Sequence, residues 1–187
     1  RVSGGLDVSR ISAAGHLSLE ATGDIQQVQT LSDPLGHSVT VAGTTSLTAG
    51  SANAIRLDDE TNDFGGLITI VSGRDVTLAD RDDMTLSNLD LAGDLSLTTR
   101  GGDTAGVGIR QTGEFVVAGD TMLEAAGASG DYYDIVLTDS RNDFDRVAVA
   151  SARNVSLVDR NAVVLGDGVT GWSLAGDLDV ETRDGIS

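Results

Sequence analysis

The chain has 187 residues, 29 acidic against 12 basic side chains, a net charge of −17 and no cysteine. This balance disfavours nucleic acid and anionic membrane surfaces as partners, because both are recognised through basic surfaces. No apolar run reaches the roughly 18–20 residues that span a bilayer, so no direct membrane insertion is expected. Aromatic residues make up only 3%, so the core must consist of Val, Leu, Ile and Ala.

Short segments of alternating apolar and small or polar residues follow one another along the whole chain. A period of two with many β-branched residues predicts β-strands, and the Gly, Asn and Asp residues that follow each segment suit turns. No segment shows the apolar period of an amphipathic helix. In chain order, the clearest predicted strands are residues 17–19, 39–41, 68–70, 76–78, 95–97, 147–149, 155–157 and 178–180.

The second half of the chain repeats much of the first. Across three blocks, 21 of 37 aligned positions are identical, at offsets of 79 to 83 residues. Such self-similarity is typical of stacked repeats with insertions in their loops. We therefore expect one continuous β-solenoid over 1–187, with an internal repeat of 42–116 and 118–187. The matching blocks are 55–64 with 135–144, 72–86 with 151–165, and 91–102 with 174–185.

Two all-β architectures suit short alternating strands, an antiparallel sandwich and a parallel β-helix. Sandwich hairpins favour Asn-Gly or Asp-Gly turns, but Asn-Gly never occurs and Asp-Gly occurs only at Asp167 and Asp184. A chain that winds into coils stacks like residues on like residues, which explains the repeat. The sequence therefore favours a parallel β-helix.

An Ala-Gly-x-x-x-Leu marker, whose last copy ends in Val180, spaces the expected coils, and its glycine is expected to let the backbone turn a corner. The spacing predicts seven or eight coils and a rod about 35–40 Å long, at about 4.8 Å per stacked strand. Because the chain opens and closes in mid-pattern, we expect it to be a fragment of a longer rod. The marker occurs at Ala14, Ala42, Ala92, Ala118 and Ala175.

The repeated Asn-Asp-Phe motif, at 62–64 and 142–144, is predicted to mark a corner. Asn and Asp tolerate left-handed backbone geometry and bond their own backbone, and the Phe is expected to cover the core. A binding surface is the alternative. Three stretches that break the alternation, 26–35, 101–108 and 126–133, are predicted to be protruding loops, where function usually resides.

Acidic clusters occur at 58–60, 80–83 and 139–145. Ca²⁺ binds six to eight oxygens, and weak surface Ca²⁺ binding is one interpretation. However, no EF-hand loop is present, and the second repeat replaces Asp82 and Asp83 with Asn161 and Ala162. We therefore expect solvated corners and predict no metal-binding or cofactor-binding residues.

The remaining candidates do not converge on a reaction centre. Among 29 acidic residues, carboxylate pairs for glycoside cleavage arise too easily to be informative. His16 takes the place that Asp94 and Asp177 hold in the other copies, and neither His16 nor His37 has ligand spacing. Asn154 begins an N-glycosylation pattern, and Trp172 either covers the core or contacts a sugar. We predict no catalytic residue and no enzyme.

The motifs at 62–65, 73–78 and 91–97 resemble the β-strand repeats of large bacterial exoproteins, the filamentous-haemagglutinin-like adhesins of two-partner secretion. The resemblance implies a right-handed parallel β-helix within a long fibre. It also implies a secreted or outer-surface location and a role in attachment, aggregation or biofilm formation. Expected partners are extracellular polysaccharide, a host or bacterial surface, or a second copy. The alternatives are a glycan-binding or polysaccharide-active module and the stalk of a toxin-delivery exoprotein.

Overall fold

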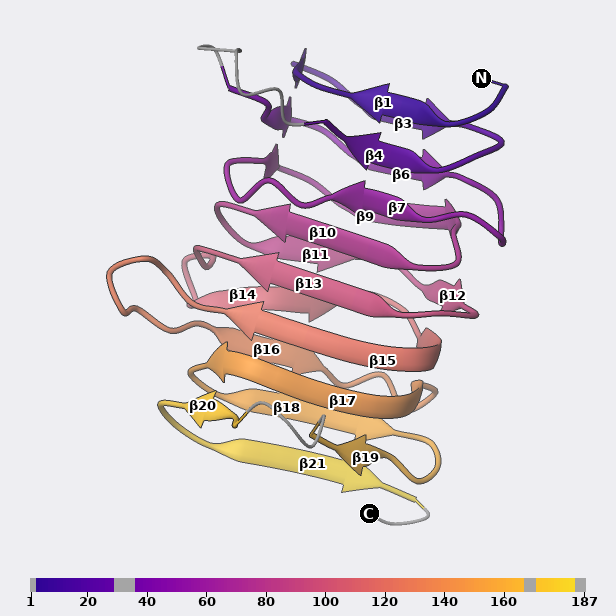
Figure 1. Ribbon diagram of the computed structural model, residues 1–187. Helices are drawn as coiled ribbons and strands as arrows, with labels where there is room; N and C mark the ends of the chain where they lie inside the picture. The colour runs from indigo at the N-terminus through magenta and orange to yellow at the C-terminus, as the bar shows by residue number, and fades with distance from the viewer. Residues whose placement is uncertain (1–2, 29–35, 167–170, 184–187) are drawn as a thin grey trace.

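The computed structural model describes residues 3–28, 36–166 and 171–183 as a stack of β-coils. Within these residues there are 21 strands and no helix, and every pairing between strands is parallel. Accordingly, the described residues contain no helix long and apolar enough to cross a membrane. Figure 1 shows the coils following one another from the N-terminus to the C-terminus in chain order. The predicted all-β parallel solenoid is confirmed.

One face of the stack is an eight-stranded sheet with one strand from each successive coil. Seven steps separate its first and last strands, so the stack has about seven turns and is about 34 Å long at about 4.8 Å per step. Its strands are β3 (Leu17–Glu20), β6 (Thr45–Thr48), β9 (Ile68–Ser72), β11 (Met84–Leu86), β14 (Val107–Gln111), β16 (Asp134–Leu137), β18 (Val155–Asp159) and β21 (Leu178–Thr182).

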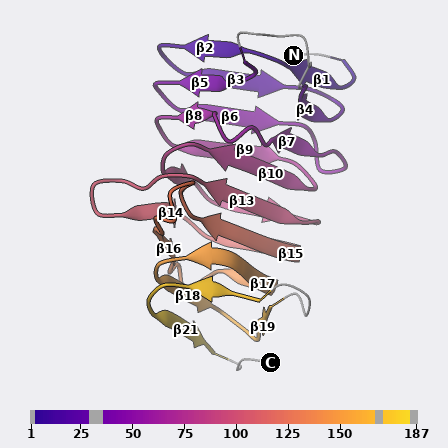
Figure 2. The ribbon, with the colours of Figure 1, turned by 60° about the vertical axis from the view of Figure 1, so that its left-hand side comes forward.

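The second sheet has ten strands. The second contains β1 (Leu6–Val8), β4 (Ile25–Gln27), β7 (Ile55–Leu57), β10 (Val76–Asp80), β13 (Leu95–Thr99), β15 (Phe115–Ala125), β17 (Asp143–Ala152) and β19 (Val164–Leu165), with β12 (Leu89–Leu91) and β20 (Ser173–Leu174) alongside. The third sheet has three strands, β2 (Ile11–Ala13), β5 (Val39–Val41) and β8 (Asp63–Phe64), which Figure 2 shows one below another at the N-terminal end of the stack.

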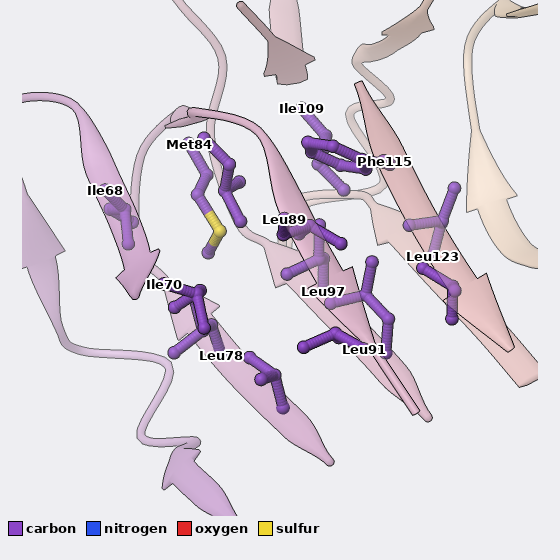
Figure 3. Packing of buried hydrophobic residues seen from close by; sticks show 14 of the residues in the cluster. Ile68, Ile70, Leu78, Met84, Leu89, Leu91, Leu97, Ile109, Phe115 and Leu123 are labelled. Atoms are coloured by element: carbon purple, nitrogen blue, oxygen red, sulfur yellow. The ribbon is translucent and has the colours of Figure 1, made fainter. Parts of the chain in front are cut away.

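Aliphatic side chains fill the interior in ladders that run along the stack. Each strand turns alternate residues inward, and the pairing places like residues on like residues. One such ladder consists of Leu57, Leu78, Leu97, Leu123 and Val149, each at most 1% exposed. Figure 3 shows the middle members of this ladder beside Ile70 and Leu91. Burial of this apolar surface is the main term that favours folding.

The glycines of the Ala-Gly marker allow neighbouring coils to approach closely. Gly43 donates its N–H to the Gly15 carbonyl at 2.9 Å, and Gly119 donates to the Gly93 carbonyl at 3.1 Å. A Cβ built on either donor would lie 2.7 Å from backbone atoms of the earlier coil. The marker glycines Gly15, Gly43, Gly93 and Gly176 lie at bends between strands, as expected for corners, but without positive φ. Close stacking on the earlier coil is therefore what favours glycine at Gly43 and Gly119.

Two of the predicted loops contain strand residues. Gln26 and Gln27 belong to β4, and the rest of 26–35 lies largely outside the described residues. Val107 and Gly108 begin β14. Residues 101–106 remain outside the strands, as does 126–133, which is closed by an antiparallel bridge between Ala126 and Tyr132.

Candidate functional site

Asn62, from the predicted corner motif, is completely buried, and both the oxygen and the nitrogen of its side-chain amide make hydrogen bonds. Its Oδ1 accepts hydrogen bonds from Gln27 Nε2 and from the Val39 backbone N–H, both at 2.8 Å. Its Nδ2 donates to Gln27 Oε1 at 3.0 Å and to the carbonyls of Leu57 and Ala79 at 3.2 and 3.3 Å. One side chain therefore joins backbone groups of successive coils.

Asn142 repeats this arrangement atom for atom in the second repeat. Its Oδ1 accepts from Gln111 Nε2 and from the Phe115 N–H, both at 2.8 Å. Its Nδ2 donates to Gln111 Oε1 at 2.9 Å and to the carbonyls of Leu137 and Val158 at 3.2 and 3.0 Å. The Asn-Asp-Phe motif is therefore structural at its Asn, through burial and not through left-handed backbone, because no described residue other than glycine has positive φ.

A buried carboxylate accepts the backbone N–H of each Phe of the motif. Asp80 is 1% exposed, and its Oδ2 and Oδ1 accept the N–H groups of Phe64 and Asp82, both at 2.7 Å. Burial raises the pKa of Asp80 to about 6, although these two hydrogen bonds act in the opposite direction. The prediction that residues 80–83 form a solvated corner is therefore wrong for Asp80.

Asp159 holds the same place in the second repeat. It is 1% exposed and accepts the N–H groups of Phe144 and Asn161 at 2.8 and 2.9 Å. Burial again raises the pKa of the Asp159 carboxyl. We call Gln27, Asn62 and Asp80 the first corner cluster, and Gln111, Asn142 and Asp159 the second corner cluster.

Four other aspartates accept hydrogen bonds from the backbone of a neighbouring coil. At one corner of the stack, a side-chain acceptor on one coil takes up the N–H of a residue on the next coil, so the carboxylates have a structural task. The acceptors are Asp24 with Ala54, Asp75 with Asp94, Asp94 with Asp120, Asp134 with Asn154, Asn154 with Asp177, and His16 with Thr44, at 2.8 to 3.1 Å.

This series of side-chain acceptors includes His16 and Asn154, two candidate residues from the sequence. His16 Nδ1 accepts the Thr44 N–H at 3.0 Å and thus replaces an Asp of the series, as its alignment with Asp94 indicates. Asn154 donates to Asp134 Oδ1 at 2.9 Å, so the glycosylation pattern lies on a half-buried side chain with a structural role.

Two grooves lie on the corner just outside the corner clusters. The first has a volume of 480 Å³, and its polar wall is formed by Asp63, Asp82, Asp83 and Asp103 beside Phe64. The second has a volume of 310 Å³ and is lined by Val116, Val117, Ala118, Asp143, Phe144, Asp145, Asn161 and Ala162. Since Asp63 and Phe64 correspond to Asp143 and Phe144, the two grooves are equivalent features of the two repeats.

The aspartates of the first groove differ in their surroundings. Asp63 pairs with Arg81 at 2.6 Å, and Asp103 pairs with Arg110. The Val107 N–H holds the pKa of Asp103 below its usual value, whereas burial, with the nearby Asp103 charge, raises the pKa of Asp83. Even so, no group of three or more acidic or histidine side chains among the described residues is arranged to hold a metal ion.

The first acidic cluster, 58–60, takes part in an ion-pair network that joins distant coils. Arg100 pairs with Glu60 and, at 2.5 Å, with Glu124, and it donates to the Ala126 carbonyl at 3.1 Å. The Arg100 hydrogen bond lowers the pKa of Glu60. This part of the cluster therefore stabilises the stack.

The aromatic candidates lie outside the grooves. Trp172 is half-buried and packs against the core, as the covering role predicts. Tyr133 packs over Gly102, where a Cβ would come within 2.3 Å of its ring. Gly102 lines the first groove, so Tyr133 lies behind one groove residue and not in the groove itself.

Sequence reasoning missed both Gln residues and the burial of both Asp residues of the corner clusters. Gln27 was included in a predicted loop, and Gln111 follows the Gly-rich stretch at an offset of 84. Asp80 and Asp159, however, are identical positions within a matching block and follow directly on apolar alternation. The same acid at the end of the same predicted strand in both copies was the available sign that this position is buried and structural.

The fold and the paired corner clusters define a repeat protein of the β-solenoid class. The chain belongs to the family described as Repeats of unknown function (DUF5649), whose model matches residues 1–71 and 73–151. Each matched segment contains one Gln–Asn pair of a corner cluster. Comparisons with curated proteins and with solved structures gave no match.

Proposed function

We propose that this chain is a rigid structural segment of a secreted or cell-surface bacterial adhesin, with a mechanical role in attachment, aggregation or biofilm formation. The observation that carries the proposal is the parallel stack of the described residues, joined at each repeat by the same Gln–Asn pair, whose Asn is completely buried. Backbone hydrogen bonds in such a stack run along the rod, so bending or stretching the rod works against many of them together.

The location of the carboxylates supports a structural role over an enzymatic one. Asp24, Asp75, Asp94 and Asp134 hold backbone N–H groups of adjacent coils. A catalytic carboxyl pair needs one acid in an apolar cleft beside a substrate site. The two most buried acids among the described residues, Asp80 and Asp159, instead accept the backbone N–H groups of Phe64 and Phe144.

A repeat deletion in the full-length protein tests the mechanical role. Removing residues 73–151 joins Ser72 to Ala152, which repeats the junction of Ser151 with Ala152, so the shortened stack should fold with an unchanged β-sheet circular dichroism signal. Cell attachment should then fall because the rod is shorter. The matched control is Asp82→Asn with Asp83→Asn in the intact rod, which should leave attachment unchanged. Loss of attachment in the control with full attachment in the deletion would contradict the proposal.

A second candidate function is binding of an extracellular polysaccharide in the first groove. The observation that favours it is a 480 Å³ hollow in which four carboxylates could accept sugar hydroxyl hydrogen bonds. A glycan array with the isolated segment, repeated with Asp82→Asn and Asp83→Asn, tests it. Signals that disappear in the double variant would support the glycan-binding role, and a blank array would count against it.

The net charge of −17 leads us to propose that cations or a partner bridge neighbouring rods. Millimolar Ca²⁺ should then promote self-association, measured by analytical ultracentrifugation, or raise the melting temperature. If Ca²⁺ changed neither quantity, bridging by this cation would be ruled out.

A further inference from the structure

Asp80 is a buried acid with no cation bonded to its carboxylate. Its two oxygens accept only backbone N–H groups, one from Phe64 on the previous coil and one from Asp82 on its own turn. The neighbouring Arg81 instead pairs with Asp63 and with Asp82. A buried carboxylate without a cationic partner carries a desolvation cost in its charged form.

Two neighbouring aspartates add to this cost. Asp63 on β8 and Asp82 on the following turn both disfavour its negative charge. On the next coil, Thr99 lies in register with Asp80, and the Arg100 guanidinium beyond it is paired with Glu60 and Glu124. Toward the interior the neighbours are neutral, since Asn62 bonds to the carbonyl of the adjacent Ala79.

Asp159 has the same two backbone donors but a milder electrostatic environment. Asp143 on β17 disfavours its charge, whereas Arg160 favours it. The residue that corresponds to Asp82 is the neutral Asn161, and the residue in register on the next coil is Thr182. Arg160 itself pairs with Asp143.

We propose that Asp80 and Asp159 make the rod acid-strengthened, so that each repeat becomes more resistant to unfolding when its buried corner carboxylate takes up a proton. Each carboxylate accepts one N–H per oxygen, which leaves lone pairs that can take a proton while both hydrogen bonds remain. The inference concerns the rod itself and does not depend on a role in adhesion.

The direction of the effect follows from proton linkage. The folded-state pKa of Asp80, about 6, is above its ordinary value of 3.8, so the folded chain binds the proton more readily than the unfolded chain. The cost of the buried charge is complete above pH 6 and disappears as the pH falls toward 4. The first corner should respond at higher pH than the second, because Asp80 faces two acids and Asp159 faces one acid and one arginine.

Thermal unfolding of the full chain at pH 7.5 and pH 5.0 tests the proposal. We expect a melting temperature about 3–6 °C higher at pH 5.0 for a chain of this size. The paired variant Asp80→Asn with Asp159→Asn should lose most of this rise. The matched control, Asp90→Asn, removes a charge from an exposed position on β12 and should keep the rise, which separates the corner effect from net charge and from His16 and His37.

Carboxyl ¹³C NMR of the unmodified chain provides a second readout if the paired variant does not fold. The Asp80 signal should titrate with a midpoint near 6, and the Asp159 midpoint should lie below that of Asp80 but above that of an ordinary aspartate. Midpoints of both residues at or below 4 would overturn the proposal. An undiminished rise in melting temperature in the folded paired variant would also overturn it.

Discussion

The two corners of the rod have the same interior and different exteriors. In both, a buried Asn, its Gln partner and a buried Asp make the same set of hydrogen bonds, at distances that agree within about 0.3 Å. Outside them, Asp82 and Asp83 of the first groove become Asn161 and Ala162 in the second. The comparison teaches that the stack requires its buried polar contacts, while the groove surface can vary without changing the fold.

Substitution of Phe144 should cause the largest loss of stability and would show how far the two corners differ in packing. Its ring meets Phe115 edge-to-face, with centroids 6.4 Å apart, whereas the first repeat has Val39 where the second has Phe115. Phe144→Ala should lower the free energy of unfolding by about 4 kcal/mol and Phe64→Ala by about 3 kcal/mol, the difference being the aromatic pair. Urea unfolding of both variants measures this, and equal losses would show that the pair contributes nothing.

The Asn residues provide the most direct way to break the equivalence of the two corners. Asn62→Ala and Asn142→Ala each remove five hydrogen bonds, two to a Gln amide, one to a backbone N–H and two to backbone carbonyls, so each should cost about 3 kcal/mol. The exposed Asn88→Ala should cost less than about 0.5 kcal/mol. If the two buried variants differed by more than about 1 kcal/mol in chemical denaturation, the corners would not be energetically equivalent.

The stacked glycines extend the comparison to the backbone. Gly43→Ala and Gly119→Ala should each cost about 2 kcal/mol, because the new Cβ would press on the coil before it. Gly15→Ala is the matched control, since a Cβ at Gly15 meets nothing within 4 Å. Melting temperatures should therefore fall for the first two variants and stay unchanged for the third, and a similar fall in all three would contradict close stacking as the reason for glycine.

Exchange of one groove residue between repeats should have the smallest effect on stability. Asp82→Asn removes an acid that faces Asp80 and should lower the Asp80 pKa, and Asn161→Asp should raise the Asp159 pKa. Each change should alter the free energy of unfolding at pH 7.5 by only about 0.5 kcal/mol, since both positions border solvent. Carboxyl NMR titration reports the two pKa values, and shifts in the opposite directions would show that these neighbours do not control them.

The sequence predicted most of the fold because the relevant signals are local. Alternation in segments such as 76–78 and 155–157 marks which side chains face inward, and the repeated blocks require like residues to stack. It predicted the corner role of Asn62 and Asn142 but attributed this role to left-handed backbone geometry. The sequence alone does not distinguish an Asn that forms a turn from an Asn that is buried and hydrogen-bonded. The acid-rich segments suggested solvated corners, and for Asp80 this was wrong.

Alternating strands, an internal repeat and the absence of helix were determined by the sequence alone, since each depends on residues within a few positions or on identity between copies. The tertiary structure decided which polar groups are buried and what they bond. Asn62 meets Gln27, 35 positions earlier, and Asp80 meets the Phe64 N–H, 16 positions earlier. The physical reason is that a hydrogen bond between coils depends on the exact number of residues in each turn, which strand alternation does not specify.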